Sequence, residues 1–317
     1  MVAATAPPSE QAVDLGRLSA HPLLARASRD DLHDLSELVW AKAWGYASQI
    51  PPLSAEQQRL VREAREEDQP EVRLAFERYN RWWSLKWFLF GGLVDIDGLT
   101  ADPSRAYDPV SNPYLKVRLP GFAVTVDEHD SDTPRKPLPD KRYLRMLAQM
   151  WCFEPLLSVP KSRQMMVTWL FCAIACHMLV SQRYANLAVI SKKEGHSDKH
   201  LERVKEIADA LPARFGAPRV DKKIGELSCG ETGSGALAMD ETAKGLRQFT
   251  FSWVFFDEMA FHDNADETLR AALATTKGTG GDKTKQGRIT LVSTPNGDEP
   301  FYRTVSNNRV IPVPHGR

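Results

Sequence analysis

The sequence predicts an α/β fold, in which a mostly parallel, doubly wound sheet is flanked by helices and preceded by a helical N-terminal subdomain. Two observations predict it. From about residue 138 onward, short apolar runs alternate with segments of helical periodicity, a pattern typical of parallel sheets. Three of the apolar runs also end directly in polar motifs. Because ligands bind at the carboxyl ends of the strands in such sheets, we expect the three motifs to lie at one edge.

Four apolar runs are predicted to form the strands, since each is short and is followed by turn or polar residues. Helical segments connect or follow them, and the first of these is almost entirely apolar. We therefore expect strands at 156–159, 186–190, 253–256 and 288–292, and helices at 169–180, 198–211 and 264–275.

The region before residue 138 has a different composition and is predicted to be a separate subdomain. Residues 1–14 are expected to be a disordered lead, 15–137 an N-terminal helical and irregular subdomain, and 138–317 the α/β core. Ser54 begins a capping box, and frequent Pro, Asp, Ser and Gly make 96–140 an irregular connection. An aromatic cluster before this connection either packs helices together or stacks nucleic-acid bases. It comprises Trp82, Trp83, Trp87, Phe88 and Phe90.

The bulk composition excludes several classes of protein. The 41 basic and 41 acidic side chains balance, so nucleic-acid contact requires a local basic face. Four cysteines in 317 residues are too few for a disulfide scaffold and indicate a reduced, intracellular protein. No signal peptide is recognised at the start, and the most apolar stretch, 82–94, is too short to span a bilayer.

Two basic clusters are candidates for DNA contact, and both also fit ordinary solvated faces. The first comprises Lys192, Lys193, Lys199, Arg203 and Lys205, and the second comprises Lys277, Lys283, Lys285 and Arg288. Another group has metal-binding residue types, but its apolar helical setting favours an ordinary core. This group comprises Cys172, Cys176 and His177.

The octet that follows the first predicted strand resembles a phosphate-binding loop in part. It has the length and the terminal hydroxyl of that loop, but it lacks both glycines and the usual lysine position of G-x-x-x-x-G-K-[ST]. Backbone N–H groups and a helix start still bind phosphate, with Lys161 and Arg163 as sources of positive charge. Met166 stands where positive φ is often needed, which is unfavourable for a residue with a Cβ. A plain strand–turn–helix is the alternative for the octet, which comprises Lys161, Ser162, Arg163, Gln164, Met165, Met166, Val167 and Thr168.

Two adjacent carboxylates, Asp257 and Glu258, end the third predicted strand. In nucleotide hydrolases the first such acid holds Mg²⁺ and the second polarises the attacking water. Asp257 and Thr168 are therefore the candidate Mg²⁺ ligands, and Glu258 is the candidate catalytic carboxylate. An ordinary strand end is the alternative. The last predicted strand ends in Ser293, Thr294 and Pro295, hydroxyls that suit a γ-phosphate sensor but also an ordinary turn.

In this order, the three motifs resemble those of the ATPase domain of large terminase subunits, the motors that package DNA into the capsids of tailed phages. The octet is similar to that family's variant phosphate loop, or Walker A motif, in which the lysine stands at the loop's start. Residues 254–261 are similar to its acid strand, or Walker B motif, and residues 293–297 to its coupling motif. Residues 245–247 resemble a Leu-Arg-Gly element of the family, with Gln248 in place of glycine. The resemblance covers about residues 140–310.

The resemblance implies a P-loop NTPase core of the ASCE type that binds ATP and Mg²⁺ and couples hydrolysis to DNA movement. It implies that Lys161 grips phosphate and that Arg163 or Arg247 acts as an arginine finger. Tyr143 and Gln149 lie where the family contacts adenine. The remaining implied roles are catalysis by Glu258, Mg²⁺ binding by Thr168 and Asp257, and coupling by Ser293, Thr294 and Pro295.

The same resemblance implies double-stranded DNA, a portal protein on the procapsid and a small terminase subunit as partners. It also implies a homo-oligomeric ring, no membrane contact and a location in the host cytoplasm. The family normally continues into a nuclease domain, whereas this sequence ends 20 residues after Gly297, so no DNA cleavage is expected of it. Two alternatives remain open, which are another translocase or helicase-type ATPase and a nucleotide-binding assembly module with a degenerate phosphate loop.

Overall fold

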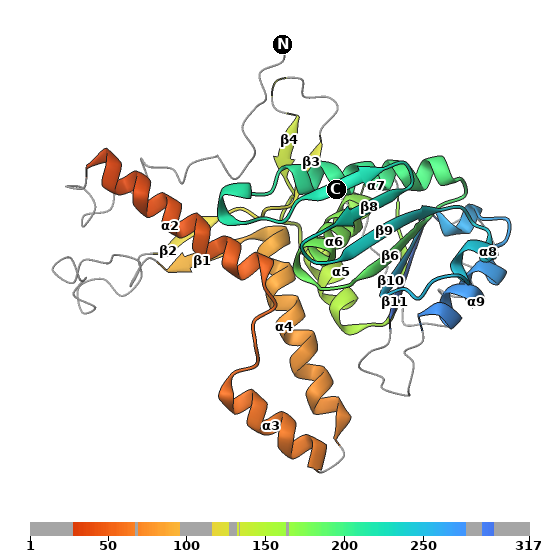
Figure 1. Cartoon of the computed structure of the whole chain (residues 1–317), viewed down its shortest axis with the longest axis horizontal. Helices are drawn as coiled ribbons and strands as arrows, with labels where there is room; N and C mark the ends of the chain where they lie inside the picture. Colours follow the sequence, from red (N-terminus) through yellow and green to blue (C-terminus); the bar gives the residue numbers. More distant parts are fainter. Residues whose placement is uncertain are drawn as a thin grey trace.

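A computed structural model describes residues 28–66, 69–95, 116–126, 132, 134–162, 165–276 and 287–294. The predicted lead of residues 1–14 lies outside this part of the chain. The described residues form a seven-stranded sheet with helices on both faces, and the N-terminal helices extend away from it on one side (Figure 1). The predicted α/β class is confirmed.

Five neighbouring strands of the sheet are parallel, and an antiparallel hairpin extends one edge. All four predicted strands are present within one residue of their predicted bounds. The strand of the coupling motif lies between the octet strand and the acid strand. In spatial order the strands are β5 (Leu156–Pro160), β11 (Arg288–Ser293), β10 (Trp253–Asp257), β6 (Asn186–Ile190), β9 (Ser234–Met239), β8 (Glu226–Cys229) and β7 (Val220–Lys223).

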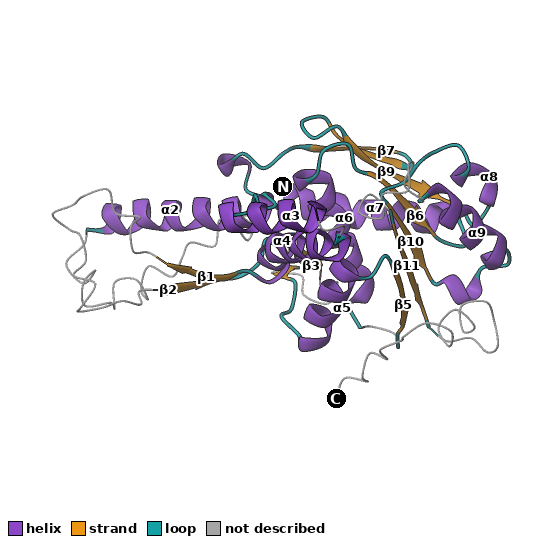
Figure 2. Cartoon of the chain, turned by 90° about the horizontal axis from the view of Figure 1, so that it is seen from below, coloured by secondary structure: helices purple, strands orange, loops and turns teal. Residues whose placement is uncertain are grey.

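The side chains of the central strand β10 alternate between two buried clusters, which explains why the strand is apolar on both faces. Trp253 and Phe255 join the cluster on one side of the sheet, and Val254 and Phe256 join the cluster on the other. Figure 2 shows the corresponding helical layers on either side of the strands. The first layer contains α5 (Arg142–Phe153), α6 (Val167–Ser181) and α7 (Glu194–Asp209), and the second contains α8 (Ala243–Leu246) and α9 (Ala265–Thr275).

The N-terminal helices pack directly on the first layer. Helix α4 contacts α5 and α6, and the Ser84 hydroxyl lies 2.9 Å from Nε2 of the buried His177. One buried cluster runs from the N-terminal helices to the sheet, so the core is continuous across residue 138. The predicted domain boundary at that residue stays a prediction. Ser54 forms the predicted capping box with Gln57. The helices are α2 (Arg29–Ser48), α3 (Ala55–Glu66) and α4 (Pro70–Phe90).

The aromatic and cysteine clusters both belong to this core. Trp87, Phe88 and Phe90 are buried, so the aromatic cluster packs helices. Burial also raises the pKa of the Cys172 thiol to about 12. Within the described ranges, three or more His, Cys, Asp or Glu side chains nowhere converge as metal ligands. Nor does any helix of the described residues have the length and apolar character to cross a membrane.

Within residues 96–140, which were predicted to be irregular, the described part includes three short strands, and a fourth lies directly before this stretch. They pair as two antiparallel ribbons. The prediction was wrong there because strands of three or four residues carry too little alternation to be recognised. The first ribbon is β1 (Gly92–Asp95) with β2 (Lys116–Leu119), and the second is β3 (Val124–Val126) with β4 (Arg135–Pro137).

Arg288 was predicted to belong to the second basic cluster, but the structure does not place it on a basic face. Its guanidinium donates hydrogen bonds to the carbonyl oxygens of Trp151, Cys152 and Glu154 at the end of α5. It also lies 5.0 Å from the centre of the Trp151 ring. Burial lowers the pKa of Arg288 to about 9. The lysines of this cluster lie outside the described residues.

Replacing Arg288 with alanine is expected to lower the free energy of unfolding by about 3 kcal/mol, because buried carbonyl groups lose their donors. Urea unfolding followed by circular dichroism measures this. Arg288→Lys is the matched control, and we expect a smaller loss from it because one ammonium group still donates to some of these oxygens. Equal stability of the alanine variant and the wild type would contradict the capping role.

Candidate functional site

The predicted motifs meet at the carboxyl edge of the sheet. Lys161 directly follows β5, and its backbone N–H donates to the carbonyl of Ser293 on β11 over 2.9 Å. Thr168 lies in the first turn of α6, and Asp257 is the last residue of β10. This confirms the expected convergence of the three motifs. Arg163, Gln164 and Pro295 lie outside the described residues.

The end of the octet adopts the left-handed conformation that this position of a phosphate loop often needs. Met166 has φ 55° and ψ 9°, in the left-handed region, and stands at the N-cap of α6. The predicted need for positive φ at this position is thus real, and methionine meets it without glycine. Tyr143 donates from its hydroxyl to the carbonyl of Met165 over 3.0 Å, so it supports the loop. Gln149, the other residue placed near adenine by resemblance, is exposed on α5.

Because Met166 has a left-handed backbone conformation, the stability of the protein is expected to depend on the shape of the side chain at this position. We expect Met166→Val to lower the free energy of unfolding by more than about 1 kcal/mol, because a β-branched residue tolerates positive φ poorly. Met166→Asn is the matched control, since it also removes the methionine packing but tolerates this conformation. Chemical unfolding of both variants measures the difference. Equal losses would show that packing, and not backbone conformation, determines the effect.

A left-handed residue also separates the two carboxylates of the acid pair. Glu258 has φ 51° and ψ 42°, so its side chain leaves the strand in a direction different from that of Asp257. The carboxylate of Asp257 lies between α6 and α7, whereas that of Glu258 lies between the octet and the end of β11. Two neighbouring acids therefore occupy two chemically different places.

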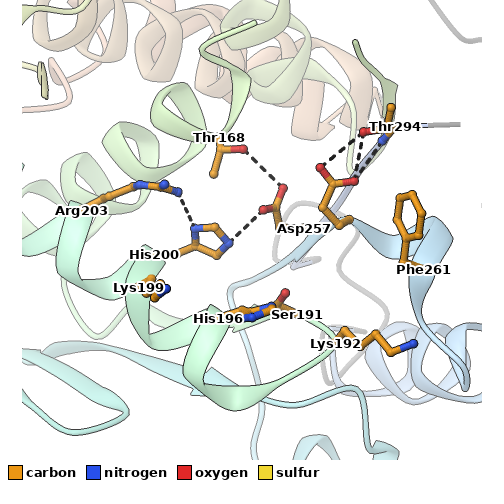
Figure 3. A pocket seen from close by; sticks show the side chains of 11 residues that line it. Thr168, Ser191, Lys192, His196, Lys199, His200, Arg203, Asp257, Phe261 and Thr294 are labelled. Carbon is orange, nitrogen blue, oxygen red and sulfur yellow. Dashed lines mark hydrogen bonds and ion pairs between the residues drawn. The ribbon is translucent and has the colours of Figure 1, made fainter. Parts of the chain in front are cut away.

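Asp257, the candidate Mg²⁺ ligand, is contacted by one side chain from each of two helices. The Thr168 hydroxyl donates to Oδ1 of Asp257 over 3.4 Å, and Nε2 of His200 lies 2.9 Å from Oδ2 (Figure 3). Burial raises the pKa of Asp257, but the hydrogen bond from His200, with smaller electrostatic effects of Lys161 and Arg203, lowers it overall. An ionised carboxylate beside a hydroxyl matches the few protein oxygens that Mg²⁺ uses at phosphate sites. The residues present therefore fit the ion.

Glu258 is held by the residues that were predicted to bind phosphate and to sense it. Nζ of Lys161 lies 2.8 Å from Oε1 of Glu258, and the lysine side chain is only 9% exposed. The backbone N–H and the hydroxyl of Thr294 each donate to Oε2 over 3.2 Å. The Ser293 hydroxyl lies 3.4 Å from the same oxygen. The octet, the acid pair and the coupling motif are thus joined through one carboxylate.

An open cavity of about 500 Å³ lies beside these groups, and its far wall is basic. That wall comes from the turn after β6 and from α7, and it contains Lys192, Lys199 and Arg203 of the first basic cluster. All three side chains line the cavity (Figure 3), where Arg203 contacts His200 and Nζ of Lys192 lies 3.1 Å from Oδ1 of Asp263. Lys205 pairs with Asp209 along α7. The complete lining is Thr168, Ser191, Lys192, His196, Lys199, His200, Arg203, Asp257, Glu258, Phe261 and Thr294.

The residue missed by sequence reasoning is His200. Among the predicted site residues that the structure describes, four line the cavity, which are Thr168, Asp257, Glu258 and Thr294. The others do not, and they are Lys161, Ser162, Met165, Met166, Val167, Arg247 and Ser293. His200 was hidden in a helix predicted only as polar, and its contact with β10 depends on how α7 packs. Arg247 points to Glu267 on α9, with 3.3 Å between Nη2 and Oε1. It is not among the residues that line the cavity, so its finger role stays a prediction.

The part of the chain that carries the motifs matches a family model. Residues 161–310 match the family model described as terminase large subunit, T4likevirus-type, N-terminal. A comparison with curated protein sequences found no match.

Several solved structures are similar to part of the chain. The large terminase ATPase domain of Thermus phage P74-26 is 16% identical over 47% of this chain and 63% of its own, with a TM-score of 0.37. The large terminase of bacteriophage HK97 is 10% identical over 50% of this chain and 34% of its own, with a TM-score of 0.40. The large terminase of a thermophilic bacteriophage, in complex with ATP-gamma-S, is 13% identical over 50% and 38%, with a TM-score of 0.39. The chain thus spans less than two thirds of each of these proteins.

Proposed function

We propose, from the premise that residues 161–310 belong to the large terminase N-terminal family, that the chain is the ATP-hydrolysing motor domain of a viral DNA-packaging terminase. The observation that carries this proposal is the separation of the two acids at the sheet edge. Asp257 lies beside the Thr168 hydroxyl, and Glu258 lies beside Lys161 and Thr294. A nucleotide hydrolase needs this division between metal binding and activation of water.

The pairing of Lys161 with Glu258 describes a resting state of such a site. When ATP binds, its phosphates compete with Glu258 for the lysine ammonium, since each is an anion that needs the same cation. Binding of substrate therefore frees the carboxylate. The site is then able to act only when phosphate is present.

The freed Glu258 orients a water molecule and accepts its proton as the water attacks the γ-phosphorus of ATP. The bond between the γ-phosphorus and the bridging oxygen breaks, and ADP leaves with that oxygen. Thr168 and Asp257 would hold Mg²⁺, which neutralises charge on the phosphate oxygens when bound. Thr294 contacts Glu258 through both its N–H and its hydroxyl, so a change at the carboxylate is passed to the end of β11.

The partners follow from this function and are proposed with it. They are double-stranded DNA, a portal protein on the procapsid and a small terminase subunit, with the motor working as a homo-oligomeric ring in the host cytoplasm. An arginine finger, in cis or from a neighbouring copy, would stabilise the negative charge that develops on the transferred phosphoryl group. Arg163 and Arg247 are the proposed sources.

A DNA-stimulated ATPase assay tests the proposal. We expect phosphate release from ATP and Mg²⁺, with a rate that changes when linear double-stranded DNA is added. Unwinding of a duplex by the chain alone would instead favour a helicase-type motor. The absence of both hydrolysis and heat in a calorimetric titration with ATP and Mg²⁺ would favour an assembly module with a degenerate loop.

A further inference from the structure

Three side chains form a continuous line from α7 to the acid strand. Nη1 of Arg203 lies 3.0 Å from Nδ1 of His200, and Nε2 of the same histidine lies 2.9 Å from Oδ2 of Asp257. The side chains of His200 and Asp257 are 8% and 9% exposed. Figure 3 shows the imidazole between the guanidinium and the carboxylate. None of the predicted motifs contains His200 or Arg203.

The chemistry of the two partners determines which nitrogen of His200 carries the proton. A guanidinium has only hydrogen-bond donors, so Nδ1 of His200 must accept from Arg203. The ring proton is then on Nε2, which donates to Asp257. Arg203 therefore selects the one neutral form of the imidazole that holds the carboxylate.

The line also fixes the orientation of Asp257. Because Oδ2 receives the hydrogen bond from His200, Oδ1 is the oxygen that faces the Thr168 hydroxyl. Arg203 also packs on α6. Its guanidinium carbon lies 5.5 Å from the centre of the ring of Trp169, the residue that follows Thr168. The carboxylate cannot turn without breaking a buried hydrogen bond.

We propose that His200, set in its Nε2–H form by Arg203, is the positioning residue that presents Oδ1 of Asp257 to the metal. This inference rests on the proposed ATPase function. Loss of such a supporting hydrogen bond weakens metal binding at protein sites by a factor of about 10–100. The effect is therefore expected on the metal dependence of nucleotide binding, separately from the grip of Lys161 on phosphate.

The test is a Mg²⁺ titration of nucleotide binding, with ADP carrying a fluorescent N-methylanthraniloyl group as the probe. His200→Leu is expected to raise the half-saturating Mg²⁺ concentration by about 10–100-fold, while binding in EDTA stays at the wild-type level. His200→Gln is the matched control, because its amide N–H donates to Asp257 and its amide oxygen accepts from Arg203. We expect it to restore a Mg²⁺ requirement close to that of the wild type.

The outcomes separate the inference from the function on which it rests. An unchanged Mg²⁺ requirement in His200→Leu, or an equal defect in the leucine and glutamine variants, would overturn the inference. Absence of probe binding by the wild type would overturn the proposed function instead. If the leucine variant fails to fold, Arg203→Met gives the same test, because it removes the group that selects the tautomer. A wild-type Mg²⁺ requirement in that variant would again overturn the inference.

Discussion

Replacement of Glu258 by glutamine is expected to reduce ATP hydrolysis by a factor of about 10²–10⁴, which is the usual contribution of a general base. Glutamine keeps the shape of the side chain and still accepts from Thr294, but it does not take a proton from water. Nucleotide binding is expected to persist and to become tighter, because the ion pair of 2.8 Å with Lys161 no longer competes with phosphate. Steady-state phosphate release and titration with a fluorescent nucleotide measure the two effects.

Glu226→Gln is the matched control for this variant, since Glu226 is exposed on β8 and is not among the residues that line the cavity. Its turnover and nucleotide affinity are expected to equal those of the wild type. Undiminished hydrolysis by Glu258→Gln would remove the catalytic role from this carboxylate. The reaction would then need another base at the cavity.

Replacement of Lys161 by alanine is expected to weaken ATP binding by a factor of about 10–100, or about 1.5–3 kcal/mol, the range for hydrogen bonds to charged groups. The lysine side chain is almost fully enclosed at the end of β5, so another cation does not easily take its place. Isothermal titration with a non-hydrolysable ATP analogue measures the loss.

Lys223→Ala is the matched control for the lysine, because Lys223 is exposed on β7. It is expected to bind the analogue as the wild type does. Retained affinity in Lys161→Ala would move phosphate recognition to other groups, and the basic wall formed by α7 would be the first place to search.

The parts of the fold that sequence predicted well are those whose patterns are local. Strand β10 is apolar at four successive positions and ends in acids, because both its faces are buried and its end meets the site. The hairpin of β7 and β8 was missed, since its four-residue strands alternate too briefly around exposed residues such as Ile224. Arg288 was assigned to a basic face because sequence does not reveal that a cation caps the end of α5.

The site was predictable as a set of residues but not as a set of contacts. The motifs identified Lys161, Asp257 and Glu258, because strand ends in a parallel sheet converge at one edge. The pairing of Lys161 with Glu258 depends on the left-handed turn at Glu258, a conformation rarely expected for a glutamate. The contact of His200 with Asp257 depends on the packing of α7 beside the acid strand. Both are tertiary contacts that carry no local sequence signal.

The measurement that tests the central claim most directly is a double-mutant cycle on the ATP-binding free energy, with Lys161→Ala and Glu258→Gln singly and together. If Glu258 holds the phosphate-binding lysine at rest, Glu258→Gln tightens ATP binding more when Lys161 is present than when it is absent. The expected coupling is about 1 kcal/mol or more, as for residues in direct contact. Additive effects of the two substitutions would contradict the shared site.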